Sequence, residues 1–214
     1  MWSRASPRFA DRTDAGRRLV PLVRHLRGPE LVVLGLPRGG VPVAFEVARA
    51  LDAPLDVVVV RKLGFPFHAE LAMGAIGEGG SEVLDEALVA YEGTTEQQVR
   101  EVERREREAL DERVRRLRSA REPLDLTGRT ALLVDDGIAT GATVRVACRV
   151  ARVRGAIRVV VASPVAPTGV ADVLIEADEV VVLHMPLHFA AVGHWYRDFT
   201  AVSDREVAAL LGLP

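Results

Sequence analysis

Two adjacent carboxylates, Asp135 and Asp136, come directly after four apolar residues, 131–134. Small residues follow at 137–141 and lead into a helical pattern that begins near Thr143. Ligands of open α/β sheets bind where strands end, and backbone N–H groups at a helix N-terminus can hold a phosphate. Carboxylates beside a phosphate would repel it unless they accept hydroxyl hydrogens or face a cation. The pattern therefore predicts a sugar phosphate, with its phosphate in the loop, its hydroxyls on the two acids and Mg²⁺ nearby.

A second short turn, residues 37–41, follows the apolar run 31–36. Gly39 and Gly40 lack a Cβ atom, so the backbone can approach an anion closely there. The guanidinium group of Arg38 can offer two parallel donors to a phosphate. A turn of this kind more often only connects a strand to a helix, but its position ahead of the acidic pair favours a second anion site.

Lys62 is the only lysine among the 28 basic residues of the chain. It follows Arg61 at the end of a predicted strand, residues 55–60, and so at the sheet edge where the two loops are expected. A solvated surface cation is the simplest interpretation of Lys62 taken by itself. His68 and Glu70 lie in the glycine-containing segment that follows. They are acid–base candidates, although such side chains are more often solvated or structural.

Short apolar runs alternate with longer amphipathic segments along most of the chain. Helices are expected at residues 41–51, 143–153 and 169–176. The alternation predicts an α/β fold: a Rossmann-like, open, mostly parallel sheet flanked by helices. Five apolar runs rich in β-branched residues predict strands buried on both faces, at residues 31–36, 55–60, 130–134, 157–162 and 180–183.

Two regions break this alternation. Residues 71–84 contain four glycines and predict a mobile hairpin or flap. Residues 95–122 alternate Glu with Arg and carry apolar side chains at helical spacing. Because the acids nearly cancel the arginines, a solvated helix with i,i+4 ion pairs is favoured over a helix that binds RNA or DNA.

The composition limits the class of protein. The 214 residues have a mass of 23.2 kDa, are 49% hydrophobic and carry a net charge of −2, so one well-filled domain with no general attraction to nucleic acid is expected. No apolar run approaches the length of a membrane span, and the N-terminus lacks the apolar stretch of a signal peptide. Cys148, the one cysteine, excludes a disulfide or a cysteine zinc site within the chain. We therefore expect a soluble, cytoplasmic protein.

Residues 131–143, ALLVDDGIATGAT, resemble the 5-phosphoribosyl-1-diphosphate (PRPP) binding motif of type I phosphoribosyltransferases throughout its length. That motif has four apolar residues, two acids and a small-residue loop that closes with Thr-Gly-x-Thr. The resemblance covers about residues 31–183. It implies that the ribose and the 5-phosphate of PRPP are bound by Asp135, Asp136, Gly137, Ile138, Ala139, Thr140, Gly141 and Thr143.

The same resemblance implies a site for the pyrophosphate group. In this family the loop after the first core strand binds pyrophosphate, often through a strained peptide bond. A basic residue commonly follows the next strand, ahead of a flexible lid that closes over the substrate. In this sequence these roles fall to Arg38, Gly39, Gly40, Arg61 and Lys62.

The implied reaction transfers ribose 5-phosphate from PRPP to a nitrogenous base or similar acceptor and releases pyrophosphate. Mg²⁺ would be held mainly through PRPP, near Asp135 and Asp136. Because negative charge gathers on the leaving diphosphate, catalysis would consist mostly of positioning and electrostatic stabilisation. We therefore expect Lys62, Arg38, Asp135 and Asp136 to be the catalytic residues.

The acceptor site is expected outside the core, in a small C-terminal hood formed by residues 184–214 with part of 1–30. His188, His194 and Tyr196 are its candidate contacts, although the aromatic residues of this segment could equally only pack the C-terminus onto the core. Ala139 stands where the 6-oxopurine branch of the family carries an aspartate base, which argues against hypoxanthine or guanine.

Two alternatives to an enzyme remain at this stage. The first is a non-catalytic module of the same fold that senses PRPP. The second, weaker one is a nucleic-acid-binding regulator that uses the arginine-rich helix. For the enzyme we expect a single domain over residues 1–214, a homodimer, and no nucleic acid or membrane partner.

Overall fold

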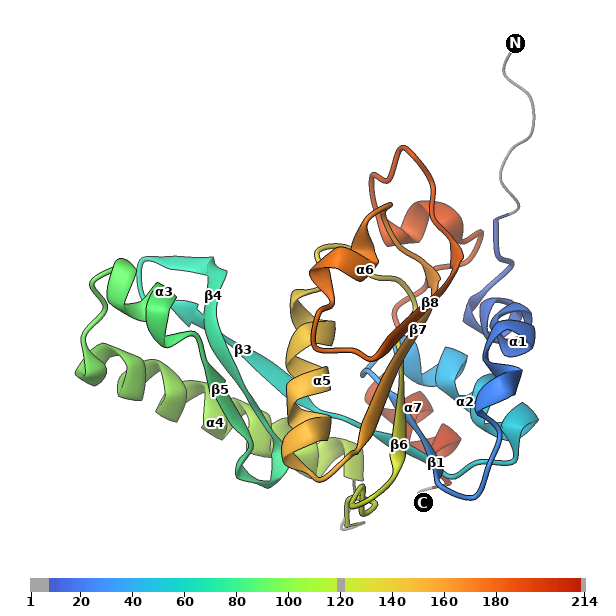
Figure 1. Cartoon of the computed structure of the whole chain (residues 1–214), viewed down its shortest axis with the longest axis horizontal. Coiled ribbons are helices and arrows are strands. Elements are labelled where there is room, and N and C mark those ends of the chain that lie inside the picture. The colour runs from blue at the N-terminus through green and yellow to red at the C-terminus, as the bar shows by residue number, and fades with distance from the viewer. Residues whose placement is uncertain (1–7, 119–121, 213–214) are drawn as a thin grey trace.

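The computed structural model describes residues 8–118 and 122–212. Its core strands are β1 Leu31–Gly35, β2 Leu55–Val57, β6 Thr130–Val134, β7 Arg158–Val165 and β8 Glu179–His184. They form one parallel sheet in the order β2–β1–β6–β7–β8 (Figure 1). The predicted α/β class and the open parallel sheet are confirmed.

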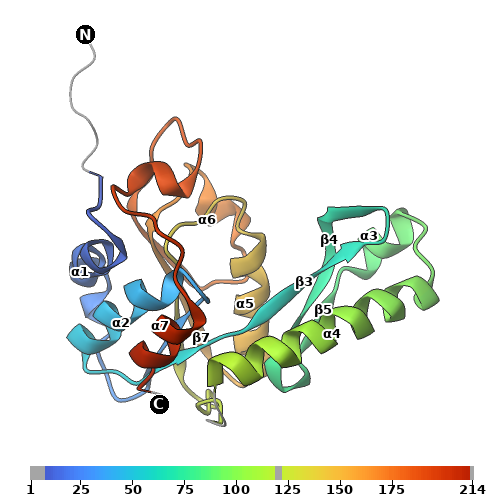
Figure 2. The ribbon, with the colours of Figure 1, turned by 180° about the vertical axis from the view of Figure 1, so that it is seen from behind.

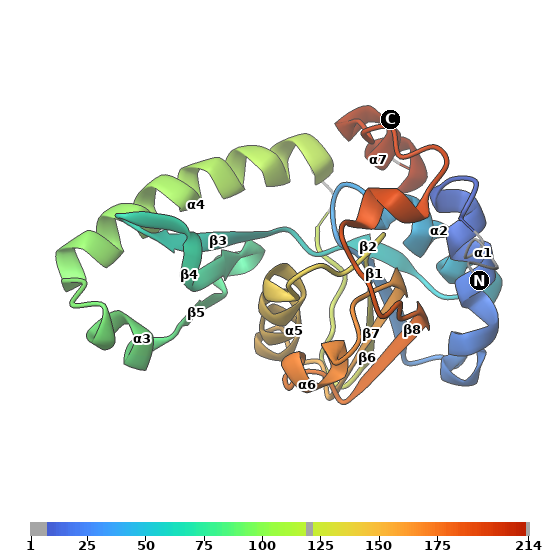
Figure 3. The same cartoon turned by 90° about the horizontal axis from the view of Figure 1, so that it is seen from above.

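Helices cover both faces of this sheet. α1 (Arg12–Val23) and α2 (Gly40–Leu51) pack on one face, and α5 (Ala142–Val153) and the short α6 (Val170–Val173) pack on the other (Figure 3). The side chains of β1 alternate between these two layers and all are buried, which is why the strand is continuously apolar. The sequence pattern predicts α2 and α5 closely, extends α6 three residues too far toward the C-terminus, and does not single out α1.

A second, antiparallel sheet stands beside the core in the order β3–β4–β5. Its strands are β3 Val60–Phe65, β4 His68–Gly77 and β5 Glu82–Leu84, with a 3₁₀ turn at Glu78–Gly80. α3 (Glu86–Tyr91) and α4 (Glu96–Arg118) complete this part, residues 60–118, which we call the lobe. It projects away from the core (Figures 1 and 3). The predicted hairpin at residues 71–84 is thus part of a three-stranded sheet.

The predicted strand at residues 55–60 is wrong in its extent. β2 ends at Val57, and Val60 already begins β3 in the other sheet. Val58 and Val59 are apolar because they are buried in the connection, with at most 1% of each residue exposed, and not because they extend the core strand. Lys62 therefore lies inside β3 and not at the carboxyl end of a core strand.

The charged helix predicted at residues 95–122 is present as α4. Its apolar residues pack in the core of the lobe, while its exposed face carries ion pairs three or four residues apart, among them Arg100–Glu96, Arg104–Glu108 and Arg107–Glu103. Most of its charge is thereby neutralised locally.

The two ends of the described chain meet on the core. Phe9 forms a β-bridge with Tyr196, next to the 3₁₀ turn Val192–Trp195. The chain then ends in α7 (Asp204–Leu210), which packs against α2 and α4 (Figure 2). A further 3₁₀ turn, Arg24–Leu26, follows α1. Within residues 8–118 and 122–212, no helix is long and apolar enough to cross a membrane.

Candidate functional site

Residues 37–41, which we call the glycine turn, follow β1, and the acidic pair Asp135 and Asp136 follows β6. The two lie against each other because β1 and β6 are neighbouring parallel strands. A Cβ atom at Gly39 would lie 2.0 Å from Oδ2 of Asp136, and one at Gly40 would lie 2.5 Å from the carbonyl oxygen of Val134. Only glycine fits at these two positions. The peptide bond between Pro37 and Arg38 is cis, in the turn where the resemblance implies an unusual peptide.

Asp135 is a strongly perturbed carboxyl group. Burial raises its pKa well above the ordinary value, and repulsion from the charge of Asp136 raises it further. The backbone N–H of Asp136 donates to Oδ1 of Asp135 at 2.9 Å. The structure therefore places two carboxyl groups with different environments side by side at the end of β6.

Asp136 is held by a residue that the sequence did not indicate. Nε of Arg12, at the start of α1, donates to Oδ2 of Asp136 at 2.7 Å, and only 11% and 14% of the two side chains are exposed. The same guanidinium lies 4.0 Å from the centre of the Phe199 ring and donates to the carbonyl oxygen of Thr200. The Tyr196 hydroxyl donates to the carbonyl oxygen of Asp136 at 2.5 Å.

Residues 137–141, which we call the phosphate loop, connect the acidic pair to α5. Gly141 takes a positive φ of 78° immediately before the helix and provides no side-chain cap to it. Ala139, Thr140 and Thr143 are exposed, whereas Ile138 is buried and donates its N–H to Val165. The N–H of Ala142 donates to Oγ1 of Thr140 at 3.4 Å. Exposed hydroxyls beside a helix N-terminus are suited to an anion. The loop is also in contact with the C-terminal tail, because a Cβ at Gly137 would lie 2.2 Å from the side chain of Val192.

Lys62 lines a cavity of about 410 Å³ together with Thr143, which lies in the first turn of α5, directly after the phosphate loop. The core contributes Pro37 and Thr143 to its lining, and the lobe contributes Lys62. The expectation that Lys62 lies near the loop is met by a different route from the predicted one, since it is carried by β3. The cavity is further lined by cationic residues of the lobe: Arg61, Arg105 and Arg113.

The side chain of Arg38 is not in that cavity. It lines a second cavity of about 270 Å³ together with Arg61, Arg113 and Arg116, and its Nη1 lies 3.9 Å from a carboxylate oxygen of Asp204. Arg61 lines both cavities and is paired with Glu106 at 2.7 Å. Arg61 and Lys62 thus line the same cavity, whereas the Arg38 side chain lines the other cavity and not this one.

The remaining predicted residues are dispersed. His68 begins β4 and is exposed, and the side chain of Glu70 lies outside the described residues. His188 and His194 are exposed on the tail. Tyr196 is only 3% exposed and packs on Phe9, and burial raises its pKa. It supports the acidic pair by its hydrogen bond and does not offer its hydroxyl to an open pocket.

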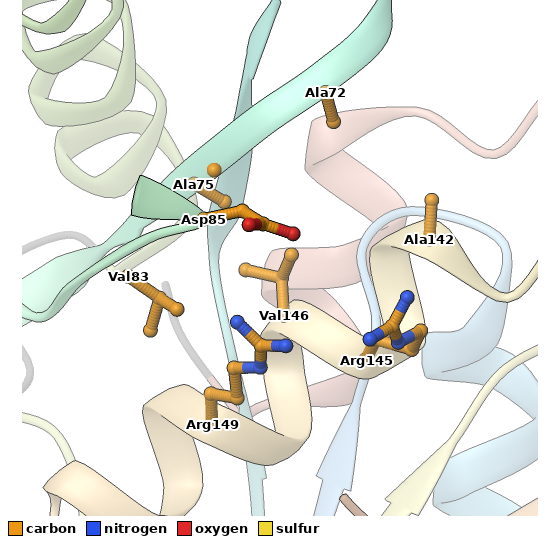
Figure 4. A pocket seen from close by; sticks show the side chains of 9 residues that line it. Ala72, Ala75, Val83, Asp85, Ala142, Arg145, Val146 and Arg149 are labelled. Atoms are coloured by element: carbon orange, nitrogen blue, oxygen red, sulfur yellow. The ribbon is translucent and has the colours of Figure 1, made fainter. Parts of the chain in front are cut away.

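A smaller cavity of about 90 Å³ lies between the lobe and α5 (Figure 4). Arg145 and Arg149 border it opposite Asp85, but both arginines bind Glu176, with N–O distances of 2.7 to 3.1 Å. Because these cations are already paired, we do not assign an anion to this cavity.

The acidic pair fits Mg²⁺ only as part of a larger set of ligands. In the described parts of the chain no three His, Cys, Asp or Glu side chains converge in a way that could hold a metal ion. Asp135 and Asp136 can supply at most two carboxylates, and Arg12 already occupies one of them. Mg²⁺ is commonly held by one or two carboxylates together with substrate phosphates. The residues fit an ion that binds with a diphosphate, and do not form a closed protein cage.

The chain is similar to known proteins along most of its length. Residues 14–183 match the model of the phosphoribosyl transferase domain. The chain is 54% identical over 204 residues to a Mycobacterium tuberculosis (strain CDC 1551) protein named "Putative phosphoribosyl transferase MT0597", and to its counterpart in strain H37Rv. The alignment covers 95% of this chain and 46% of each relative, so the chain spans about half the length of these curated relatives.

Solved structures show the same fold. The crystal structure of TT1426 from Thermus thermophilus superimposes with a TM-score of 0.87 at 46% identity, over 95% of this chain and 97% of that chain. The AQ2163 protein from Aquifex aeolicus has a TM-score of 0.50 at 12% identity, over 85% of this chain and 78% of that chain, which is a likeness of fold alone. The match over residues 14–183, together with these relatives, shows that the chain belongs to the phosphoribosyl transferase family.

Proposed function

We propose that this chain transfers ribose 5-phosphate from PRPP to a nitrogenous base or a similar acceptor and releases pyrophosphate, in the presence of Mg²⁺. The observation that carries the proposal is the meeting of the acidic pair, the Gly39–Gly40 turn and the phosphate loop at one sheet edge, with Lys62 and Thr143 lining one cavity. The acids suit the ribose hydroxyls of PRPP and the loop suits its 5-phosphate. The Gly39–Gly40 turn and Lys62 suit its diphosphate.

In the proposed reaction, the bond between C1 of the ribose and the diphosphate oxygen breaks, and its electron pair leaves with the diphosphate. The acceptor nitrogen forms the new bond to C1, which carries oxocarbenium character in the transition state. Asp135 and Asp136 would hold the ribose hydroxyls, and the loop that ends at Thr143 would hold the 5-phosphate. Lys62 would stabilise the charge that develops on the leaving group. Mg²⁺, when bound, would offset further charge on the diphosphate.

A PRPP-sensing module is the second candidate, and two observations favour it. Arg12 already binds Asp136, so a ribose hydroxyl would have to share or displace that ion pair. Ala139 provides no side chain that could take a proton from the acceptor. Lys62 favours the enzyme, because a site that only binds PRPP has no need to stabilise a departing group.

The test is calorimetric titration of PRPP with and without Mg²⁺ against the wild-type chain and the Asp135→Asn/Asp136→Asn variant. We expect Mg²⁺-dependent binding by the wild type and none by the variant. Asp111→Asn, on the exposed side of α4, is the control and should bind as the wild type. Unchanged PRPP affinity in the double variant would overturn the site. Pyrophosphate release with a panel of nucleobases then separates the enzyme from the sensor.

A further inference from the structure

Arg113 differs from the other arginines of α4 that have assigned contacts. Its Nη2 donates to the carbonyl oxygen of Pro37 at 3.1 Å, which ties the lobe to the glycine turn of the core. Among the described residues, no carboxylate oxygen lies within 4.0 Å of its guanidinium, whereas Arg100, Arg104 and Arg107 on the same helix each have one. The side chain is half-buried.

The surroundings of Arg113 are positively charged. Burial is the largest cause that lowers its pKa; the charge of Asp204 raises the pKa, and the charges of Arg38 and Arg61 lower it again. A desolvated cation near two other cations is unfavourable unless negative charge compensates it. Asp204 lies 3.9 Å from the guanidinium of Arg38, so a further anion can serve Arg113.

The 410 Å³ cavity shows where that anion can lie. Among the residues that the structure describes, four cationic side chains of the lobe line it, and Glu106 is the one acid in its lining. Glu106 is already bound by Arg61 at 2.7 Å and Arg105 at 3.2 Å. Lys62 and Arg113 are left as the two cations of this cavity without a carboxylate partner in the described structure, and Thr143, in the first turn of α5, lines the same cavity.

We propose that Arg113 binds the diphosphate group of PRPP together with Lys62. The proposal rests on the proposed function for the identity of the anion. A guanidinium offers a planar fork of donors that suits two phosphate oxygens, and a diphosphate is large enough to contact both cations at once. Arg113 is thus a further diphosphate-binding residue. It lies in α4, outside the 131–143 motif, and it also contacts the glycine turn.

The experiment measures binding of inorganic pyrophosphate with Mg²⁺, and separately of ribose 5-phosphate, by calorimetry. The proteins are the wild type, Arg113→Gln, Arg113→Lys and the control Arg104→Gln, which removes an exposed arginine from the same helix. We expect Arg113→Gln to weaken pyrophosphate binding about 10- to 100-fold, as for the loss of a charge-assisted contact. Arg113→Lys should weaken it less, and Arg104→Gln should leave it unchanged.

Ribose 5-phosphate separates the two hypotheses. Its affinity should be the same in the wild type and in Arg113→Gln, because it contacts the acids and the phosphate loop. Equal pyrophosphate affinity in the wild type and Arg113→Gln would overturn the role of Arg113 and leave the proposed function standing. If both Arg113 variants lose affinity for pyrophosphate and for ribose 5-phosphate to the same extent, Arg113 only holds Pro37 in place. That result would likewise overturn the role of Arg113 in binding the diphosphate. Failure of the wild type to bind either PRPP or ribose 5-phosphate would overturn the proposed function itself.

Discussion

The carboxyl group of Asp135 makes stability depend on pH in an unusual direction for an acid. Its pKa in the folded protein is raised by burial and by the charge of Asp136. The folded state therefore binds this proton more tightly than the unfolded state does. The contribution to stability is fully present at low pH, and it is lost as the pH rises from the ordinary value of 3.8 through the higher pKa of the folded state.

Asp135→Asn should consequently raise the free energy of unfolding, and raise it more at mildly alkaline than at mildly acidic pH. The amide oxygen can still accept from the N–H of Asp136, while the buried charge is gone. Urea denaturation at the two pH values measures the difference. Asp198→Asn is the opposite control, because hydrogen bonds from Thr200 lower the pKa of Asp198, so its loss should destabilise slightly at neutral pH. A variant at 135 that is less stable than the wild type at alkaline pH would contradict this account.

Lys62 should affect turnover more than PRPP affinity. Its contact strengthens as charge develops on the leaving diphosphate, so it stabilises the transition state more than the bound substrate. We expect Lys62→Ala to lower kcat about 30- to 1000-fold with a much smaller change in PRPP affinity. Lys62→Arg should recover part of the loss. Unchanged turnover in Lys62→Ala would return Lys62 to the role of a surface cation, and binding without any turnover in the wild type would identify the sensor.

At the scale of elements, the sequence predicts β1, β6 and β7 well because these strands are almost entirely buried and therefore read as continuous apolar runs. β8, at the edge of the sheet, is only half-buried, so the expectation that it is buried on both faces is wrong although its position is correct. The same signal failed at residues 55–60, where the chain stays apolar while it passes from β2 to β3. Burial and strand pairing are separate properties, and an apolar run reports only the first.

Contacts between distant elements explain what the sequence left out of the site. Arg12 reaches Asp136 across 124 positions of the chain, and no local pattern marks it among the arginines nearby. Arg113 is similarly hidden within a helix rich in arginine. The acids and the phosphate loop were predictable because one short motif, residues 131–143, contains both, and Gly39 and Gly40 because a second short turn follows another strand. Arg12 and Arg113 become neighbours of the site only when the lobe and α1 are placed.

At the scale of the whole molecule, segments from both ends of the described chain cover the site. Phe9 is fully buried against the ring of Tyr196, and Val192 contacts Gly137 of the phosphate loop. The exposed histidines His188 and His194 lie on the same tail. This arrangement supports the proposal that the tail, with residues near Phe9, forms the hood over an acceptor.

His188→Ala and His194→Ala should therefore change the KM for the acceptor and leave the affinity for Mg²⁺ and PRPP nearly unchanged. Both side chains are exposed, so neither change is expected to unfold the protein. His25→Ala is the control, since His25 is exposed and pairs with Glu179 at the opposite end of β8. If acceptor kinetics stay the same in both tail variants, the tail only packs the chain and the acceptor contacts must be sought elsewhere.

The lobe has a consequence for how such a protein can change over time. Lys62 and Arg113 belong to residues 60–118, whereas the acids and the phosphate loop belong to the core. Under the proposed function, the lobe cations that contact the leaving group are thus encoded separately from the residues that hold the sugar, although the core also contributes the Gly39–Gly40 turn to the diphosphate site. Recombination that exchanged the lobe alone would then change how readily the diphosphate departs while the core continued to hold the same pentose.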